Sequence, residues 1–269
     1  LAVMDTVTSR GTAIVNFVQN SLLLLSEGEH GNQEEGLCAS ATSVALGLRL
    51  LTNTICTQAE LLQIKQKAQK SGSVKSASSA DDQVSVGGMG VKSLMTLLFD
   101  CIKASGGQLG GFTTEDDAEK ECLFEAASSC ALSLMKLHVF AASLTVDQWH
   151  TLGWTLLCPV QSIRQKLFNT LSISIQIYPL HAKFLAYPCL FATDDSLHAR
   201  AEQTLGFAVQ RRRRTHEELC SQAIGQSESQ EKLRRLTESL MPESILPYLL
   251  HLLSYHPEFP TSTAIDNET

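Results

Sequence analysis

The sequence predicts an all-α protein whose helices stack in pairs as a superhelix, or solenoid. Leucine and alanine, with 40 and 24 residues, outnumber valine and isoleucine, with 13 and 11, and this balance favours helices over strands. Periodic apolar stretches recur along the chain between short polar or proline-containing breaks, which indicates a series of amphipathic helices. Apolar residues make up 43% of the chain, enough to bury a sizeable core.

In the first part of the chain, apolar periodicity predicts helices over residues 7–25, 37–56, 57–69 and 91–104. Residues 71–90 lose this periodicity and contain six serines and four glycines. We therefore expect a long, mobile surface loop inserted between two helices there.

The second part of the chain shows clearer helix boundaries. Glycines at 106, 107, 110 and 111 break the pattern, and a helix is expected over residues 116–137. Thr145 and Gln148 have the spacing of a capping box for the next helix. Pro159 is expected in the first turn of the following helix, and Asp194 with Asp195 at the N-cap of the one after it.

A repeat relates three of these expected helices. Phe124, Ile163 and Ala199 occupy similar positions early in them, at spacings of 39 and 36 residues. This is the period of HEAT and armadillo helix pairs, which bury their apolar faces by stacking on neighbours. The prediction is therefore a HEAT/armadillo-like α-α superhelix of about five to six helical pairs, although an irregular helical bundle can also show such spacings.

Searches for chemistry mostly exclude function classes. The longest apolar stretch, residues 13–25, is interrupted by polar side chains and is too short to span a membrane. The chain has no phosphate-binding glycine motif, no HExxH and no GxSxG. The eight cysteines form no CxxC pair and sit mostly among apolar residues, which is typical of reduced intracellular thiols. We therefore expect no enzyme activity, no cofactor and no metal site.

One pair of side chains could still form a nucleophile and its base. Cys220 and His216 are four residues apart on an expected helix, but no third residue orients them, so a catalytic role is disfavoured. The net charge of −7 also disfavours nucleic acid as the main partner.

The strongest charge feature is a run of four consecutive arginines, Arg211 to Arg214. It is interpreted either as a basic patch for an acidic partner or as a solvated helix end, where the helix dipole and the following glutamates favour cations. A protein partner is preferred over DNA because the whole chain is acidic.

Residues 241–258, read as MPESILPYLLHLLSYHPE, resemble a segment of the precocious-dissociation-of-sisters (Pds-type) cohesin regulators. That segment has a Pro-Glu, a Pro-Tyr helix and a His-Leu-Leu. Further collinear resemblances run through residues 123–134, 145–149 and 163–168, and through Ala199-Arg200 with the basic run. They cover about residues 116–258.

The resemblance implies one HEAT-like array over residues 1–258, family-like over 116–258 and more weakly matched over 1–115, with residues 259–269 as a tail or the start of another repeat. Because the chain begins at Leu1 rather than methionine, we expect an internal fragment of the longer protein.

The resemblance also implies a function. Such a chain would be a non-enzymatic scaffold in the nucleus, associated with chromatin, that regulates sister chromatid cohesion by binding the cohesin kleisin subunit and cohesin release and protection factors. The candidate partner-binding residues form one basic set, namely Arg200, Arg211, Arg212, Arg213 and Arg214. The alternatives are a HEAT-type adaptor in transport or another multi-subunit assembly, and direct nucleic-acid binding through the basic run.

Overall fold

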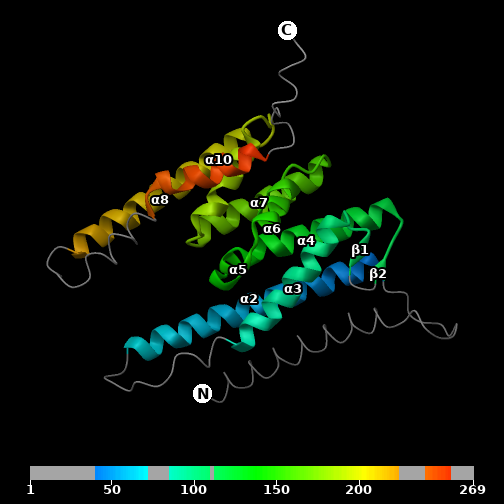
Figure 1. Cartoon of the computed structure of the whole chain (residues 1–269), viewed down its shortest axis with the longest axis horizontal. Helices are drawn as coiled ribbons and strands as arrows, with labels where there is room; N and C mark the ends of the chain where they lie inside the picture. The colour runs from blue at the N-terminus through cyan, green and yellow to red at the C-terminus, as the bar shows by residue number, and fades with distance from the viewer. Residues whose placement is uncertain (1–39, 72–84, 110–111, 224–239, 256–269) are drawn as a thin grey trace, which may run out of the picture. The chain divides into compact units, whose positions relative to one another are not determined.

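Helices dominate the protein, as the leucine and alanine excess predicts (Figure 1). The computed structural model describes residues 40–71, 85–109, 112–223 and 240–255. The chain divides into two units, Leu1–Thr155 and Leu156–Thr269, and each is described by itself. The predicted all-α, HEAT-like fold class is confirmed.

The first unit consists of helices and one short hairpin. Its elements in chain order are α2 (Ala41–Ser71), α3 (Ser85–Lys103), β1 (Gln108–Leu109), β2 (Phe112–Thr113), α4 (Asp117–Leu134), α5 (His138–Ser143) and α6 (Val146–Thr155). The strands pair antiparallel, with Leu109 opposite Phe112.

Helices α2 and α3 both pack against α4. Their contact faces are apolar: Leu48, Leu98 and Leu123 are fully buried, one from each helix. Polar contacts also join α2 to the region of α4. Arg49 forms an ion pair with Glu125 at 2.9 Å, and Glu60 pairs with Lys136, just beyond α4, at 2.8 Å.

The second unit is organised around a ten-residue 3-10 helix. Its elements are α7 (Gln161–Ile177), η1 (Ala182–Phe191), α8 (His198–Ala223), η2 (Pro242–Ile245) and α10 (Leu246–Ser254). Helices α8 and α10 both contact η1. The rings of Phe168 on α7 and Phe191 on η1 meet edge to face, with centroids 4.9 Å apart. Apolar burial on η1 therefore holds this unit together.

Two predicted helix starts are confirmed in atomic detail. At α6, the Thr145 hydroxyl accepts from the Gln148 N–H at 3.2 Å, and the Gln148 side-chain oxygen accepts from the Thr145 N–H at 3.1 Å. Before α8, the Asp194 carboxylate accepts from the N–H groups of Ser196 and Leu197 at 2.9 and 3.0 Å. The predicted core face of α7 is also correct, since Ile163, Leu167, Leu171 and Ile175 are buried.

Several predicted boundaries are wrong. The helices expected over 37–56 and 57–69 are one helix, α2, because no proline or glycine interrupts the junction. There the Thr54 and Thr57 hydroxyls donate to carbonyls one turn back without ending the helix. Residues 85–90, expected in the loop, form the start of α3. Pro159 precedes the N-cap of α7, which is Val160.

The repeat is less regular than its spacing predicts. Ile163 and Ala199 lie in the first turns of α7 and α8, but Phe124 lies seven residues after the start of α4. Only α7 and α8 therefore carry the matching residue at a similar place near the helix start. The first expected helix, over residues 7–25, lies outside the described residues, as do 72–84 of the expected loop and the tail at 259–269. Within the part of the chain that the structure describes, no helix is long and apolar enough to cross a membrane.

Candidate partner-binding surface

Helix α8 carries the whole candidate basic set, and its geometry disperses the arginine run. Arg211, Arg212, Arg213 and Arg214 lie in the interior of the helix, more than two turns from either end. The interpretation as a solvated helix end is therefore wrong. Successive helical residues differ in direction by about 100°, so the four side chains leave the helix in four directions rather than forming one patch.

Arg211 is directed at the end of α7. Its guanidinium donates to the carbonyl of Gln176 at 2.8 Å and to the carbonyl of Tyr178, and it lies 5.9 Å from the centroid of the Phe207 ring. Gln176 lies in the last turn of α7 and Tyr178 is the residue after the helix, so no amide of the helix donates to either carbonyl. Burial lowers the pKa of Arg211 from its ordinary value. Arg211 therefore joins α8 to α7.

The other three arginines of the run differ in exposure. Arg212 is half-buried, and its pKa is lowered first by burial and then by the charge of Arg211. Arg213 and Arg214 are exposed. Of the run, these two are the side chains best placed to meet a partner.

Arg200 lies on the same side of α8 as Arg211, because eleven residues correspond to about three helical turns. Its guanidinium donates to the Asn169 side chain of α7 at 2.6 Å and lies 5.2 Å from the centroid of the Phe168 ring. Between the two arginines, the hydroxyls of Ser172 and Thr204 are hydrogen-bonded at 2.9 Å. We call this row of contacts the α7–α8 seam.

The seam has an apolar rim that sequence reasoning missed. Ile173 and Ile177 on α7 are 56% and 62% exposed, and Phe207 on α8 is 45% exposed. A signal was present in the sequence. Ile173 and Ile177 fall out of phase with Ile163, Leu167, Leu171 and Ile175, which make the core face of the same helix, so large apolar residues occupy both faces of α7.

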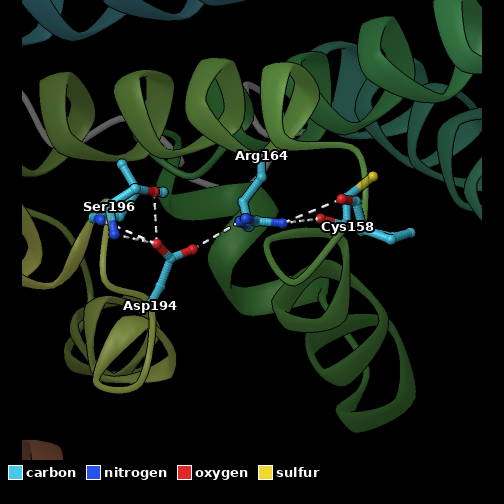
Figure 2. A network of polar contacts seen from close by, with 6 residues as sticks. Cys158, Arg164, Asp194 and Ser196 are labelled. Atoms are coloured by element: carbon cyan, nitrogen blue, oxygen red, sulfur yellow. Dashed lines mark hydrogen bonds and ion pairs between the residues drawn. The ribbon is translucent and has the colours of Figure 1, made fainter.

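A second polar cluster lies at the starts of α7 and α8 (Figure 2). The Arg164 Nε donates to the Asp194 carboxylate at 2.8 Å, and one Nη donates to the Cys158 carbonyl at 2.7 Å. The other carboxylate oxygen of Asp194 accepts from the Ser196 hydroxyl at 2.6 Å. The pKa of Asp194 is held below its ordinary value, chiefly by that hydroxyl and further by the backbone N–H of Ser196 and the charge of Arg164.

This cluster borders an open cavity of about 520 Å³, whose lining is mainly polar and includes Gln161, Thr193 and Asp195 with Leu157 and Leu190. Arg164 and Asp194 are engaged with one another and with nearby backbone, so they connect two loops rather than present reactive groups. The Arg164 and Arg200 positions are 36 residues apart, and each side chain bonds a neighbouring repeat element. Their shared role is to join successive repeats.

The possible nucleophile pair gains little from the structure. The Cys220 sulfur lies 3.7 Å from His216 Nε2 on an exposed part of α8. Among the described residues, no group of three or more histidine, cysteine or acidic side chains could hold a metal ion.

Comparison with known families covers almost the entire chain. The family model described as sister chromatid cohesion protein PDS5 matches residues 2–268, including the first 115 residues, for which the sequence offered no specific motif. No curated protein matches. The helical fold is consistent with this match over almost the whole chain, and the chain belongs to the PDS5 family of sister chromatid cohesion proteins.

Proposed function

We propose that this chain acts without catalysis, as a scaffold that regulates cohesin on chromatin in the nucleus by capturing a segment of the cohesin kleisin subunit. Membership of the PDS5 family supports a role in sister chromatid cohesion. The kleisin contact, and contact with cohesin release and protection factors, go beyond that and rest on the surface described above.

The observation that carries the proposal is the α7–α8 seam. Two helices of one unit present cations and exposed apolar side chains on adjacent elements. An extended peptide lying along such a row would meet apolar anchors and basic side chains in turn, as helical-repeat proteins bind their partners. The positive charges of this surface would speed the association with an acidic peptide more than they would increase its affinity.

The test is a pull-down of full-length kleisin by the whole chain. The four arginines are not replaced together, because Arg211 and Arg212 are half-buried and Arg211 bonds α7. The variant reverses only the exposed pair, R213E/R214E, of which Arg214 is the one on the seam side of α8 by helical phase. We expect retained kleisin to fall by about tenfold for this double charge reversal, while R213K/R214K, which keeps both charges, retains wild-type binding.

A third variant serves as the charge control. K103E reverses an exposed lysine at the end of α3, in the other unit, and is expected to bind as the wild type does. Unchanged kleisin binding by R213E/R214E would remove these arginines from the contact and leave the scaffold role standing. Failure of the wild-type chain to retain kleisin at all would overturn the proposed function.

Two other functions remain as outcomes of related experiments. A chain that ignores cohesin subunits but retains another assembly would be a general HEAT-type adaptor. Direct nucleic-acid binding would show as an affinity for DNA that falls steeply as salt rises, because several phosphate contacts release counterions.

A further inference from the structure

Three exposed apolar residues of the second unit, Ile173, Ile177 and Phe207, lie together at the α7–α8 seam, while a separate exposed set that includes Leu246 and Leu250 lies on α10. Ile173 and Ile177 are one helical turn apart, so their side chains are neighbours on one face of α7. The Arg211 guanidinium lies over the Phe207 ring and donates to the carbonyls of Gln176 and Tyr178, the residues on either side of Ile177. This chain of contacts brings Phe207 to the same end of α7 as Ile177.

On each of the two helices, a cation is followed seven residues later by an exposed apolar side chain. On α7, Lys166 is followed by apolar residues seven and eleven positions later, Ile173 and Ile177. On α8, Arg200 is followed by Phe207 seven positions later, and Arg214 follows after another seven. Residues seven apart lie on nearly the same side of a helix, two turns along. Each helix therefore presents cations and apolar side chains on one face.

Acidic side chains are sparse on this face. By helical phase, Glu218 lies on the Arg211 side of α8, two turns farther along, and Glu217 lies at the edge of this face, three residues after Arg214, while Glu202 points away from it. Helix α7 contains no acidic residue. The apolar patch is thus bordered by positive charge, and the complementary occupant is a peptide that carries carboxylates beside large apolar side chains.

We propose that the α7–α8 seam is a docking site for an acidic amphipathic peptide segment. Its apolar side chains pack on Ile173, Ile177 and Phe207, and its carboxylates face Lys166, Arg200 and Arg214. The proposal rests on the binding role proposed above and defines its surface and the chemistry of its partner. A phosphate backbone fits less well, because the donors of Arg211 already bond carbonyls and apolar side chains occupy the centre of the patch.

The experiment selects ligands without assuming kleisin. Short random peptides displayed on phage are selected against the whole chain, and the recovered peptides are synthesised and titrated by fluorescence anisotropy. We expect the recovered sequences to combine aspartate or glutamate with large apolar residues three or four positions apart. The variant I173S/I177S, which replaces exposed side chains and leaves the core untouched, should bind them about tenfold more weakly or worse.

The matched control is L250S on α10, which removes one apolar side chain that is 67% exposed in the same unit. It should bind the peptides as the wild type does, and circular dichroism melts should show that all three proteins are equally folded. The proposal is overturned if no peptide is enriched, if the enriched peptides lack acidic and apolar residues, or if I173S/I177S binds them normally.

Two results separate this site from the proposed function. Kleisin retained equally by wild type and I173S/I177S would leave the scaffold role intact and overturn the seam as the docking site. Selected peptides that need the isoleucines, together with absent kleisin binding, would confirm the seam and overturn the kleisin assignment.

A short DNA duplex that binds with steep salt dependence and displaces the peptides equally from wild type and L250S would point to nucleic acid and overturn the peptide proposal.

Discussion

At the scale of single residues, the end of α3 shows how one turn constrains the sequence. The N–H of Gly106 bonds the Cys101 carbonyl at 2.9 Å, and the N–H of Ser105 bonds the Ile102 carbonyl at 3.0 Å. This is the Schellman pattern of helix ends. Ser105 and Gly106 both have positive φ, 51° and 81°, a region that favours glycine. Ser105 therefore adopts a conformation that is unfavourable for its residue type.

Two substitutions at this turn should act in opposite directions. S105G removes a strained side chain, and we expect it to raise the free energy of unfolding by about 0.5–1 kcal/mol. G106A should lower it by more than about 1 kcal/mol, because the new Cβ would lie 1.9 Å from the Lys120 carbonyl oxygen. Urea unfolding followed by circular dichroism measures both. A neutral G106A would show that α4 shifts away from the turn at little cost.

The Asp194 carboxylate makes stability sensitive to acid. Its pKa is depressed in the folded protein, mainly by the Ser196 hydroxyl and further by the Ser196 N–H and Arg164. A carboxyl whose pKa is lower when folded stabilises the protein above its unfolded pKa of about 3.9, and that contribution is lost as the pH falls through the folded value. Stability from this group is therefore complete near neutral pH.

The variant D194N tests this titration. It should be less stable than the wild type near neutral pH, and the difference should shrink as the pH is lowered through about 4. Urea unfolding at a series of pH values gives the difference directly. S244A, which removes a hydroxyl from η2 and no member of the Asp194 cluster, is the control and should show no such trend. A D194N deficit that stays constant with pH would mean that the carboxylate charge is not what stabilises this junction.

At the scale of elements, α7 depends on its neighbour for its C-terminus. Its C-cap, Tyr178, has an extended backbone, and the Tyr178 N–H bonds the Ser174 carbonyl at 3.0 Å. No basic residue lies in the last turn of α7 to interact with the exposed carbonyls. Arg211 supplies that interaction from α8, so the end of one helix is completed by a side chain of another.

Removal of Arg211 should therefore loosen α7 more than removal of its exposed neighbour does. We expect R211A to lower the free energy of unfolding by about 1 kcal/mol or more and to speed hydrogen exchange at the Tyr178 amide. R213A is the matched control, because the same side chain is deleted from an exposed position of the same helix. Equal effects of the two variants would contradict the capping role of Arg211.

At the scale of the whole molecule, the thiols report how burial controls reactivity. Burial raises the pKa of Cys101 to about 12 and that of Cys130 to about 11. Cys220 lies exposed on α8. Because the thiolate is the reactive species, the folded chain should be alkylated by iodoacetamide at Cys220 far sooner than at Cys101 or Cys130, as peptide mass spectrometry would show. After denaturation in urea the three sites should react at similar rates, and early labelling of Cys101 would contradict the buried core.

Prediction from sequence succeeded where the signal is local. The Thr145–Gln148 box and the Asp194 cap could be predicted because their hydrogen bonds join residues at most three positions apart. It failed at the boundary inside α2, where one helix continues through Thr54 and Thr57, whose hydroxyls bond back into it. The arginine run lies within one helix, as its candidate role requires, yet the sequence could not show which arginines are exposed, since that depends on contacts with α7, more than thirty residues away.

Composition and periodicity alone determined the all-α class and the core face of α7, and sequence motifs alone led to the cohesion family, because short-range spacing sets which residues share a helical face. Only the tertiary structure decided how the basic set is divided. Arg200 and Arg211 join α8 to α7, Arg212 is half-buried, and Arg213 and Arg214 remain exposed. The physical reason is that a hydrogen bond or a buried surface needs a partner from elsewhere in the chain, and packing alone brings that partner into reach.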